Sequence, residues 1–232
     1  MVKCISCIND FICSYFLKGG YEMNIYLVRH GRQLSPRCNV NVDLSNEGIL
    51  QSKLLAERLK EVPFDALYSS NLIRAIHTAE LINREHGLKH EIREGIKEID
   101  YGDWTGLEDD EIKEKYKGFI LENDRLRDDL RFPGGECGQD VVQRAMPIIN
   151  ELIASGKKNI LVVTHGGVIR ALTSHLLGLD QSQKALFGVA LEHTGITEFV
   201  YNEEKNRFYL QRFNDYAHLE GYDELMRHSW KK

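Results

Sequence analysis

The sequence predicts an α/β fold, a three-layer α/β/α sandwich whose central sheet is mostly parallel. Short apolar runs alternate along the chain with longer segments whose apolar residues recur at helical spacing. Two of these runs, residues 24–28 and 159–163, are typical of strands buried on both faces. The chain has 232 residues, enough for one α/β domain with a full core and too few to require a second.

The individual elements follow from these runs and from the residues that bound them. After the strand at 24–28, the sequence predicts, in chain order, a helix over 46–60, a strand over 64–68, a helix over 70–85, a strand near 90–93, a helix over 138–154, a strand over 159–164, a helix over 167–177 and strands over 196–201 and 207–213. Ser45 and Ser70 are the expected N-caps of the first two helices, and Gly87 is the expected stop of the second. The last two strands are expected to form a hairpin that finishes the sheet.

The regular alternation is interrupted at residues 105–135, where charges of both signs are mixed. This segment predicts a small helical insertion, placed where a lid over a crevice would lie, although a solvated helical pair explains the same pattern. Arg125, Arg127 and Arg131 either reach a second anionic group or pair with neighbouring acids. We favour pairing with Asp124, Asp128 and Asp129.

The chain is expected to consist of an N-terminal extension (1–22), one domain (23–220) and a C-terminal tail (221–232). The extension is mostly apolar up to Leu17, but Asn9 and Asp10 interrupt it and no convincing cleavage site follows. Met23 directly precedes the first strand. We therefore expect residues 1–22 to be peripheral to the core.

Composition narrows the class of protein. The net charge is −5 without a basic stripe, which argues against nucleic acid as a partner, and no apolar segment approaches the roughly 20 residues that span a bilayer. The five cysteines are an odd, scattered set, which favours reduced thiols and a cytoplasmic location over a disulfide framework. Cys4-x-x-Cys7 has no second pair of ligands to complete a metal site. The oligomeric state cannot be predicted.

Two strands end in the same kind of residue. The first leads into Arg29-His30-Gly31, and the strand at 159–164 leads into His165-Gly166-Gly167. Because ligands bind at the carboxyl ends of the strands in an open α/β sheet, both histidines are expected to face one crevice. The glycines let a backbone approach closely, and the start of a helix at Gly166 points N–H groups at an anion. This combination suits an anionic substrate and nucleophilic chemistry at nitrogen.

Two further positions suit the same chemistry. Arg74 lies in the first turn of a helix, where a cation is unfavourable unless it shares an anion with the free N–H groups. A carboxyl group among aromatic neighbours suits a general acid. Glu98, Asp100 and Asp103 all satisfy that description, and spacing does not choose among them.

At this point a resemblance becomes specific. Members of the histidine phosphatase superfamily, branch 1 (phosphoglycerate mutase-like), carry motifs similar to Leu27-Val28-Arg29-His30-Gly31, to Tyr68-Ser69-Ser70-Asn71-Leu72-Ile73-Arg74-Ala75, to Glu98-Ile99-Asp100-Tyr101-Gly102-Asp103-Trp104-Thr105-Gly106, to Pro133-Gly134-Gly135-Glu136 and to Thr164-His165-Gly166-Gly167. The match runs from Met23 to about Leu219.

The resemblance implies a role for each motif. His30 would be the nucleophile that becomes phosphohistidine, Arg29, Arg74 and His165 would hold the phosphoryl oxygens, and Glu98 would protonate the leaving group. The family's phosphate-binding amide is less clear here, with Asn39 as a stand-in and Gln33 as the alternative. No metal or cofactor is implied.

Two other histidines depart from or extend the pattern. His77 is expected to face away from the site. His193 is either a pocket-rim residue or a plain strand-edge histidine, and we favour the latter.

The function implied is hydrolysis of a small phosphorylated metabolite through a phosphohistidine intermediate. A phosphoglycerate mutase uses the same chemistry, but this chain lacks the serine after the first-motif glutamate and the longer first loop of cofactor-dependent mutases. A catalytically inactive phosphate-binding module is a third alternative, disfavoured because every expected reactive residue is present.

Overall fold

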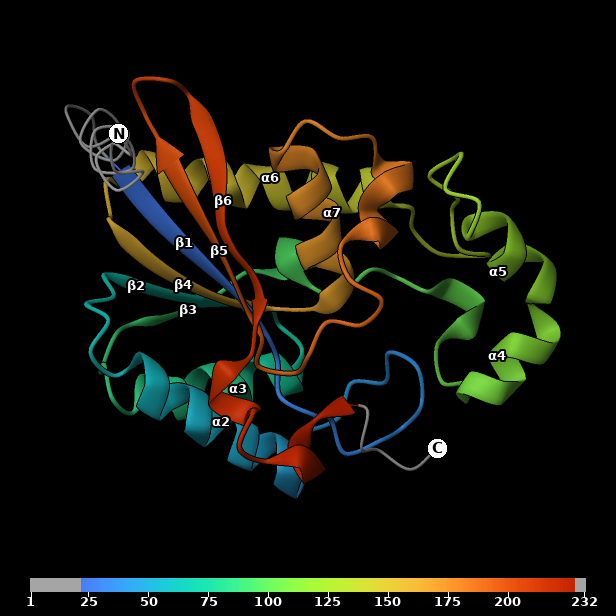
Figure 1. Ribbon diagram of the computed structural model, residues 1–232, viewed down its shortest axis with the longest axis horizontal. Coiled ribbons are helices and arrows are strands. Elements are labelled where there is room, and N and C mark those ends of the chain that lie inside the picture. The colour runs from blue at the N-terminus through green and yellow to red at the C-terminus, as the bar shows by residue number, and fades with distance from the viewer. Residues whose placement is uncertain (1–21, 228–232) are drawn as a thin grey trace, which may run out of the picture.

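The computed structural model describes residues 22–227, and these form one α/β unit around a six-stranded sheet (Figure 1). The strands are β1 (Glu22–Arg29), β2 (Ala66–Ser69), β3 (His90–Ile92), β4 (Asn159–Thr164), β5 (Ile196–Asn202) and β6 (Arg207–Asp215). The α-helices are α2 (Asn46–Leu59), α3 (Ile73–Asn83), α4 (Asp109–Lys115), α5 (Lys117–Asn123), α6 (Gly138–Ala154) and α7 (Gly166–Leu176). The predicted extension, including Cys4, Cys7 and Cys13, lies outside the described residues apart from Glu22.

The strand order is β3-β2-β4-β1-β5-β6, with β1 to β4 parallel and with β5 and β6 antiparallel at one edge. Side chains alternate across β1, so Ile25 and Leu27 join one core while Tyr26 and Val28 join the other. Helices α6 and α7 cover the first face, and α2 and α3 cover the second (Figure 1). The predicted three-layer sandwich with a mostly parallel sheet is confirmed.

Most of the predicted elements agree with the structure to within two residues at each end, and the helix over 138–154 agrees at both ends. The start of α3 is an exception. Ser70 was expected to cap it, but the helix begins at Ile73, and its N-cap residue, Leu72, makes no side-chain cap. The Ser70 hydroxyl instead contacts the imidazole of His165 across the sheet. A tertiary contact has therefore replaced the expected local one.

The 105–135 insertion contains α4 and α5, which project to one side of the sheet (Figure 1). Two of its arginines, Arg125 and Arg131, pair with acids, as favoured, but with different partners from those expected. Arg125 contacts Glu122 at 2.5 Å, and Arg131 contacts Asp140 of α6. Asp129 accepts from the first two amides of α6 and pairs with Lys184 at 2.6 Å.

The part of the predicted C-terminal tail that the structure describes packs onto the domain. Leu219, Leu225 and Met226 are buried in a small cluster beside α2. The amide of Gln51, itself fully buried, donates to the carbonyl of Leu225 at 2.8 Å. Among the described residues, no helix is long and apolar enough to cross a membrane.

Candidate active site

The parallel pairing of β1 with β4 brings the two strand-end histidines together. Arg29 lies opposite Thr164 in the register, so His30 and His165 leave the sheet side by side. The backbone N–H of His30 donates to the carbonyl of Thr164 at 3.0 Å, and the two imidazole centroids lie 4.9 Å apart. The two histidines therefore lie together at one edge of the sheet, as predicted.

Close packing of the backbone fixes the turn after His30. A Cβ on Gly31 would lie 2.6 Å from the carbonyl oxygen of Gly48 in α2, closer than real Cβ atoms approach. Only glycine fits this approach, as the sequence predicts, and the chain therefore turns directly beneath the amino-terminal end of α2.

The hydrogen bonds of His30 define which ring nitrogen is reactive. Nδ1 lies 2.7 Å from the carbonyl oxygen of Gly31, which accepts only, so Nδ1 carries the proton. The lone pair is then on Nε2, where the Nε of Arg74 donates to it at 3.1 Å. A second imidazole, His193, flanks the ring at 5.2 Å and lies 2.8 Å from the His30 carbonyl through its Nδ1.

The surroundings of His30 keep it neutral. Burial, followed by the positive charges of Arg74 and Arg29, lowers its pKa well below the ordinary 6.5. The ring is 3% exposed. An imidazole that stays unprotonated at neutral pH can use its Nε2 lone pair as a nucleophile.

Arg74 is turned inward from the first turn of α3 and is 1% exposed. Besides His30, its guanidinium donates to the carbonyl of Val40 at 2.9 Å and to Oδ1 of Asn39 at 3.0 Å. Asn39 has a positive φ of 47°, a conformation that asparagine tolerates better than most residues. Its amide nitrogen contacts the carbonyl of Ile99 at 3.3 Å. Asn39 therefore contacts the site through Arg74, and both atoms of its amide group have partners within the protein.

Two buried polar atoms next to His30 lack a partner among the described residues. They are Nε of Arg29 and Nδ1 of His165. His165 is fully buried and its Nε2 lies 2.6 Å from the hydroxyl of Ser70. Because a buried donor without a partner costs free energy, these atoms indicate where the oxygens of an anion would bind. Burial lowers the pKa of His165 well below 6.5, which favours the neutral ring in this state.

Glu98 is the carboxylate of the three candidates that lines the pocket. Its Oε1 accepts from the amides of Ile99 at 2.9 Å and Gly167 at 3.0 Å, so this side chain occupies the hydrogen-bonding position at the start of α7. A Cβ on Gly167 would lie 2.6 Å from Oε1, so a larger residue there would displace the Glu98 carboxyl group. Asp100 instead accepts from Gly102, at 2.9 Å.

An ion pair between Arg144 and Glu136 holds the backbone that carries Glu98. Arg144 of α6 binds Glu136 with Nε and Nη2 at 2.8 and 2.9 Å, a bidentate geometry. The same guanidinium donates to the carbonyls of Gly95, Lys97 and Glu98 at 2.8, 2.8 and 3.1 Å. The Pro-Gly-Gly-Glu segment thus positions Glu98 through Arg144.

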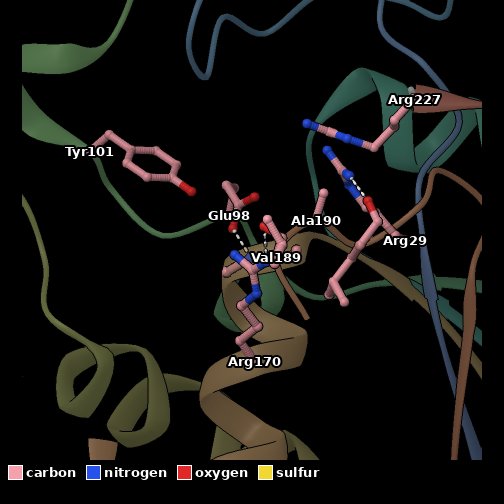
Figure 2. Close-up of a pocket in the computed structure, with 10 residues that line it drawn as sticks. Arg29, Glu98, Tyr101, Arg170, Val189, Ala190 and Arg227 are labelled. Carbon is pink, nitrogen blue, oxygen red and sulfur yellow. Dashed lines mark hydrogen bonds between the residues drawn. The ribbon is translucent and has the colours of Figure 1, made fainter. Parts of the chain in front are cut away.

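A pocket of about 170 Å³, shown in Figure 2, lies beside these residues, and the side chains of Arg29 and Glu98 line it. The residues that line it are Arg29, Glu98, Tyr101, Gly166, Gly167, Arg170, Val189, Ala190, Leu191 and Arg227. The Tyr101 hydroxyl points toward Glu98, and the guanidinium groups of Arg227 and Arg29 lie next to each other (Figure 2). Burial and the nearby positive charge of Arg227 lower the pKa of Arg29.

Sequence reasoning missed three of these residues, namely Tyr101, Arg170 and Arg227. Tyr101 stood inside a quoted motif, but only its neighbours Glu98, Asp100 and Asp103 were considered. Arg170 is four residues after Gly166 on the same helix, a spacing that places both on one face. Arg227 carries no local signal, because only the packing of the C-terminal segment brings it to the pocket.

Three other predicted positions are resolved as follows. Gln33 braces its own loop, with its amide donating to the carbonyls of Ser35 and Arg37 at 2.8 and 3.0 Å. His77 contacts Asp43 at 2.5 Å and is absent from the pocket lining, as expected. His193 was favoured as a strand-edge residue, but it is buried against His30 because its loop packs over the end of β1. Within residues 22–227, no group of three or more His, Cys, Asp or Glu could hold a metal ion.

Comparison with known proteins agrees with the motifs. A family model described as histidine phosphatase superfamily (branch 1) matches residues 25–215. A 2,3-bisphosphoglycerate-dependent phosphoglycerate mutase of Methylobacterium radiotolerans is 33% identical over 176 residues, covering 70% of this chain and 82% of the relative. A glucosyl-3-phosphoglycerate phosphatase of Mycolicibacterium vanbaalenii is 34% identical over 179 residues, covering 71% and 78%.

A solved structure has the same fold. The structure of a mycobacterial glucosyl-3-phosphoglycerate phosphatase superposes with a TM-score of 0.76 at 27% identity, covering 84% of this chain and 99% of the other. The shared motifs, the matching family model and the common fold converge on one conclusion: this chain belongs to the histidine phosphatase superfamily, branch 1.

Proposed function

We propose that this protein is a phosphomonoesterase that hydrolyses a small phosphorylated metabolite through a phosphohistidine formed at His30. The observation that carries the proposal is the neutral imidazole of His30, with its Nε2 lone pair directed at Arg74 and with two buried nitrogens that lack a partner, Nε of Arg29 and Nδ1 of His165, beside it. The phosphatase among its relatives supports hydrolysis as the reaction class.

In the first step, Nε2 of His30 attacks phosphorus in line with the ester oxygen. The phosphorus–nitrogen bond forms as the phosphorus–oxygen ester bond breaks. The ring becomes cationic on phosphorylation, and the Gly31 carbonyl that accepts from Nδ1 stabilises that charge. Fixed positive charge from Arg29 and Arg74 stabilises the transferring group in the transition state.

Glu98 supplies the proton. In its protonated form it donates to the departing oxygen, so the leaving group departs as an alcohol. The resulting carboxylate, held by the amides of Ile99 and Gly167, then takes a proton from the water that attacks the phosphohistidine. His30 is released with its lone pair restored, and inorganic phosphate leaves with the proton balance closed.

The direct test is hydrolysis of p-nitrophenyl phosphate by the purified protein and by His30→Ala. We expect turnover in the wild-type protein and its loss in the variant, by a factor of about 10³ or more, because a covalent step is removed. Turnover by His30→Ala at the wild-type rate would contradict the proposal. Circular dichroism of the variant checks that the fold is retained.

A mutase is the second candidate, because a phosphoglycerate mutase is among the relatives. A mutase returns the phosphoryl group to a second substrate instead of to water. Stoichiometric phosphoryl exchange between phosphoglycerates with little release of phosphate would favour the mutase, whereas steady phosphate release favours the phosphatase.

We also propose a cytoplasmic location, supported by the odd cysteine count and by Cys38 and Cys137, which are both free thiols.

A further inference from the structure

The loop that packs over the end of β1 is strained at one residue. Thr194 has a φ of 59° and is fully buried. A β-branched residue is an outlier in this conformation, and Thr194 is the one such case within residues 22–227. Strain of this kind persists only where the surrounding structure imposes it, and it is concentrated at functional sites. The 192–195 loop therefore has a conformation that its neighbours must hold.

Three consecutive residues of this loop bond to the main chain at the nucleophile. The N–H of Thr194 donates to the carbonyl of Arg29 at 2.9 Å, and the N–H of Arg29 donates to the carbonyl of Gly195 at 3.2 Å. The carbonyl of His30 accepts only, so Nδ1 of His193 donates to it at 2.8 Å. The orientation of the His30 ring therefore depends on the loop as well as on β4.

A chain of hydrogen bonds runs from α2 to the strained residue. Nη1 of Arg58 in α2 lies 3.2 Å from Nδ1 of His218, and because a guanidinium only donates, Nδ1 is the acceptor. The proton of the neutral ring is then on Nε2, which donates to Oγ1 of Thr194 at 2.9 Å. The Thr194 hydroxyl donates in turn to the carbonyl of His193 at 2.6 Å. The chain therefore ties the strained loop to α2.

The surroundings of His218 suit this arrangement. Burial, followed by the positive charge of Arg58, lowers the pKa of His218 to about 4, which favours the neutral ring that the chain requires. Arg58 is also paired with Asp215. His218 lies on the helical turn Ala217–Leu219, which packs against α2 (Figure 1). No step of the proposed reaction uses these contacts.

Resting on the proposed function, we propose that Thr194 and His218 are positioning residues for His30. The chain of hydrogen bonds holds the 192–195 loop in its strained form, and the loop holds the His30 imidazole in line with the phosphorus that it attacks. In-line attack requires a narrow range of geometry, and a misplacement of about 1 Å can reduce the rate by a factor of about 10². Both residues act through His193 and the main chain of Arg29 and His30, and not through a contact with the substrate.

Two amide variants of His218 separate its two hydrogen bonds. Glutamine places its amide group near the position of Nε2 and can still donate to Thr194, whereas asparagine reaches only the position of Nδ1, beside Arg58. In stopped-flow mixing with p-nitrophenyl phosphate, the release of p-nitrophenolate in the first turnover measures the attack by His30. We expect this rate to fall by about 10- to 100-fold in His218→Asn and to stay within about threefold of wild type in His218→Gln.

Thr194→Val tests the same link from its other end, so the result does not depend on one variant folding. Valine has the shape of threonine without the hydroxyl, and we expect a similar loss of rate. A double variant that combines Thr194→Val with His218→Asn should lose no more than either single variant, because both changes remove one link.

Competitive inhibition by inorganic phosphate measures anion binding without the covalent step. In the proposed function, Arg74 and His165 hold the anion from α3 and from the end of β4. The Ki for phosphate should therefore stay within about twofold of wild type in every variant, while the first-turnover rate changes.

His86→Asn is the matched control. His86 is also a half-buried imidazole, and its ring packs against Phe64 with centroids 5.1 Å apart. Phe64 precedes β2 and so lies at the end of the sheet opposite His30. His86→Asn should keep the wild-type rate, and circular dichroism checks that each variant is folded.

The outcomes separate this proposal from the proposed function. A slower first turnover in His218→Asn and Thr194→Val, with the rate restored in His218→Gln and an unchanged Ki for phosphate, supports the positioning role. A wild-type rate in either His218→Asn or Thr194→Val overturns that role, and the proposed function then stands if turnover still depends on His30. An equal loss in His218→Gln or in His86→Asn, or weaker binding of phosphate, also overturns it. No hydrolysis by the wild-type protein overturns both.

Discussion

The residues around His30 and the residues that line the neighbouring pocket are held in different ways. The first group, here called the phosphoryl cluster, consists of Arg29, His30, Arg74 and His165, of which Arg29 also lines the pocket. Its residues follow strand ends or open a helix, and three of them are at most 3% exposed. The second group, the rim, consists of Tyr101, Arg170 and Arg227, which come from the segment just before the insertion, from α7 and from the C-terminal segment.

This difference separates chemistry from selectivity. The members of the phosphoryl cluster lie at strand ends or in the first turn of α3, and hydrogen bonds hold their side chains. Arg74 donates to His30, His165 contacts Ser70, and Arg29 donates to the carbonyl of Leu191. The rim residues depend on segments outside the sheet, which can vary without disturbing the reacting atoms. Changes in the cluster should therefore reduce turnover of every substrate, whereas changes in the rim should alter which substrate is preferred.

The largest effect among the remaining tests is expected at Glu98, which borders both groups. In Glu98→Gln, kcat for alkyl phosphates should fall by about 10²- to 10⁴-fold, because the leaving alkoxide needs a proton. Hydrolysis of p-nitrophenyl phosphate should fall much less, since p-nitrophenolate leaves readily without one. Steady-state kinetics on both substrate types checks this.

The matched control for Glu98 is Asp100→Asn. Asp100 belongs to the same motif, but its carboxylate accepts from the Gly102 amide, a contact that asparagine can keep. This variant should retain both activities. If kcat fell equally for alkyl and aryl phosphates in Glu98→Gln, Glu98 would be a positioning residue and not the proton donor. The separation between reacting residues and rim residues would then not hold at Glu98.

A smaller effect is expected at Ser70, which positions the cluster from behind. If its hydroxyl donates to Nε2 of His165, the proton of that ring is held on Nδ1, the atom without a partner. Ser70→Ala should lower kcat by up to about tenfold for every substrate, the value of one hydrogen bond. Kinetics on two phosphomonoesters that differ only in a carboxylate group should show no change in which of the two is preferred.

The control for Ser70 is Ser174→Ala, which removes an equally buried hydroxyl that donates to the carbonyl of Asp180 at 3.0 Å. Ser70→Thr keeps the hydroxyl and should recover part of the rate. A loss in Ser70→Ala no greater than in Ser174→Ala would remove Ser70 from the description of the cluster.

The last prediction concerns stability. Burial lowers the pKa of His30, His165 and His193 well below 6.5, and neighbouring charges add to the shift. The unfolded chain therefore binds protons that the folded chain does not, and the free energy of unfolding should fall as the pH drops below about 6.5. Each group contributes a slope of up to about 1.4 kcal/mol per pH unit until its folded pKa is reached.

Urea unfolding between pH 7 and pH 5 measures this slope, and His193→Gln isolates one group. The glutamine amide can still donate to the carbonyl of His30, so the fold should persist with a smaller slope. An unchanged slope in the variant would mean that His193 is not protonated differently in the two states.

Much of the sheet and of the phosphoryl cluster could be predicted from the sequence, for a physical reason. A strand buried on both faces is a continuous apolar run, and residues directly after it must emerge at a sheet edge, which located His30 and His165. Arg74 was found because its charge is unfavourable at a helix start without an anion. These signals are local in sequence.

The errors arose where distant contacts decide the outcome. Ser70 has the local signature of a helix cap, but its hydroxyl contacts His165, 95 residues away. His193 was favoured as an edge residue, although its loop folds over His30. Arg227 lies in a segment whose importance depends on the packing of Leu225 and Met226 against α2. No periodicity in the sequence reports such contacts.

The central claim is that the phosphoryl group passes through His30, and trapping the intermediate tests it most directly. The protein is mixed with a phosphomonoester that it hydrolyses, and the reaction is quenched with alkali within one turnover. The protein is then digested and analysed by mass spectrometry. We predict a base-stable phosphoryl group on the peptide that contains His30, absent from His30→Ala and accumulating in Glu98→Gln with p-nitrophenyl phosphate. A phosphoryl group on His165 or His193, or turnover by His30→Ala at the wild-type rate, would contradict the account.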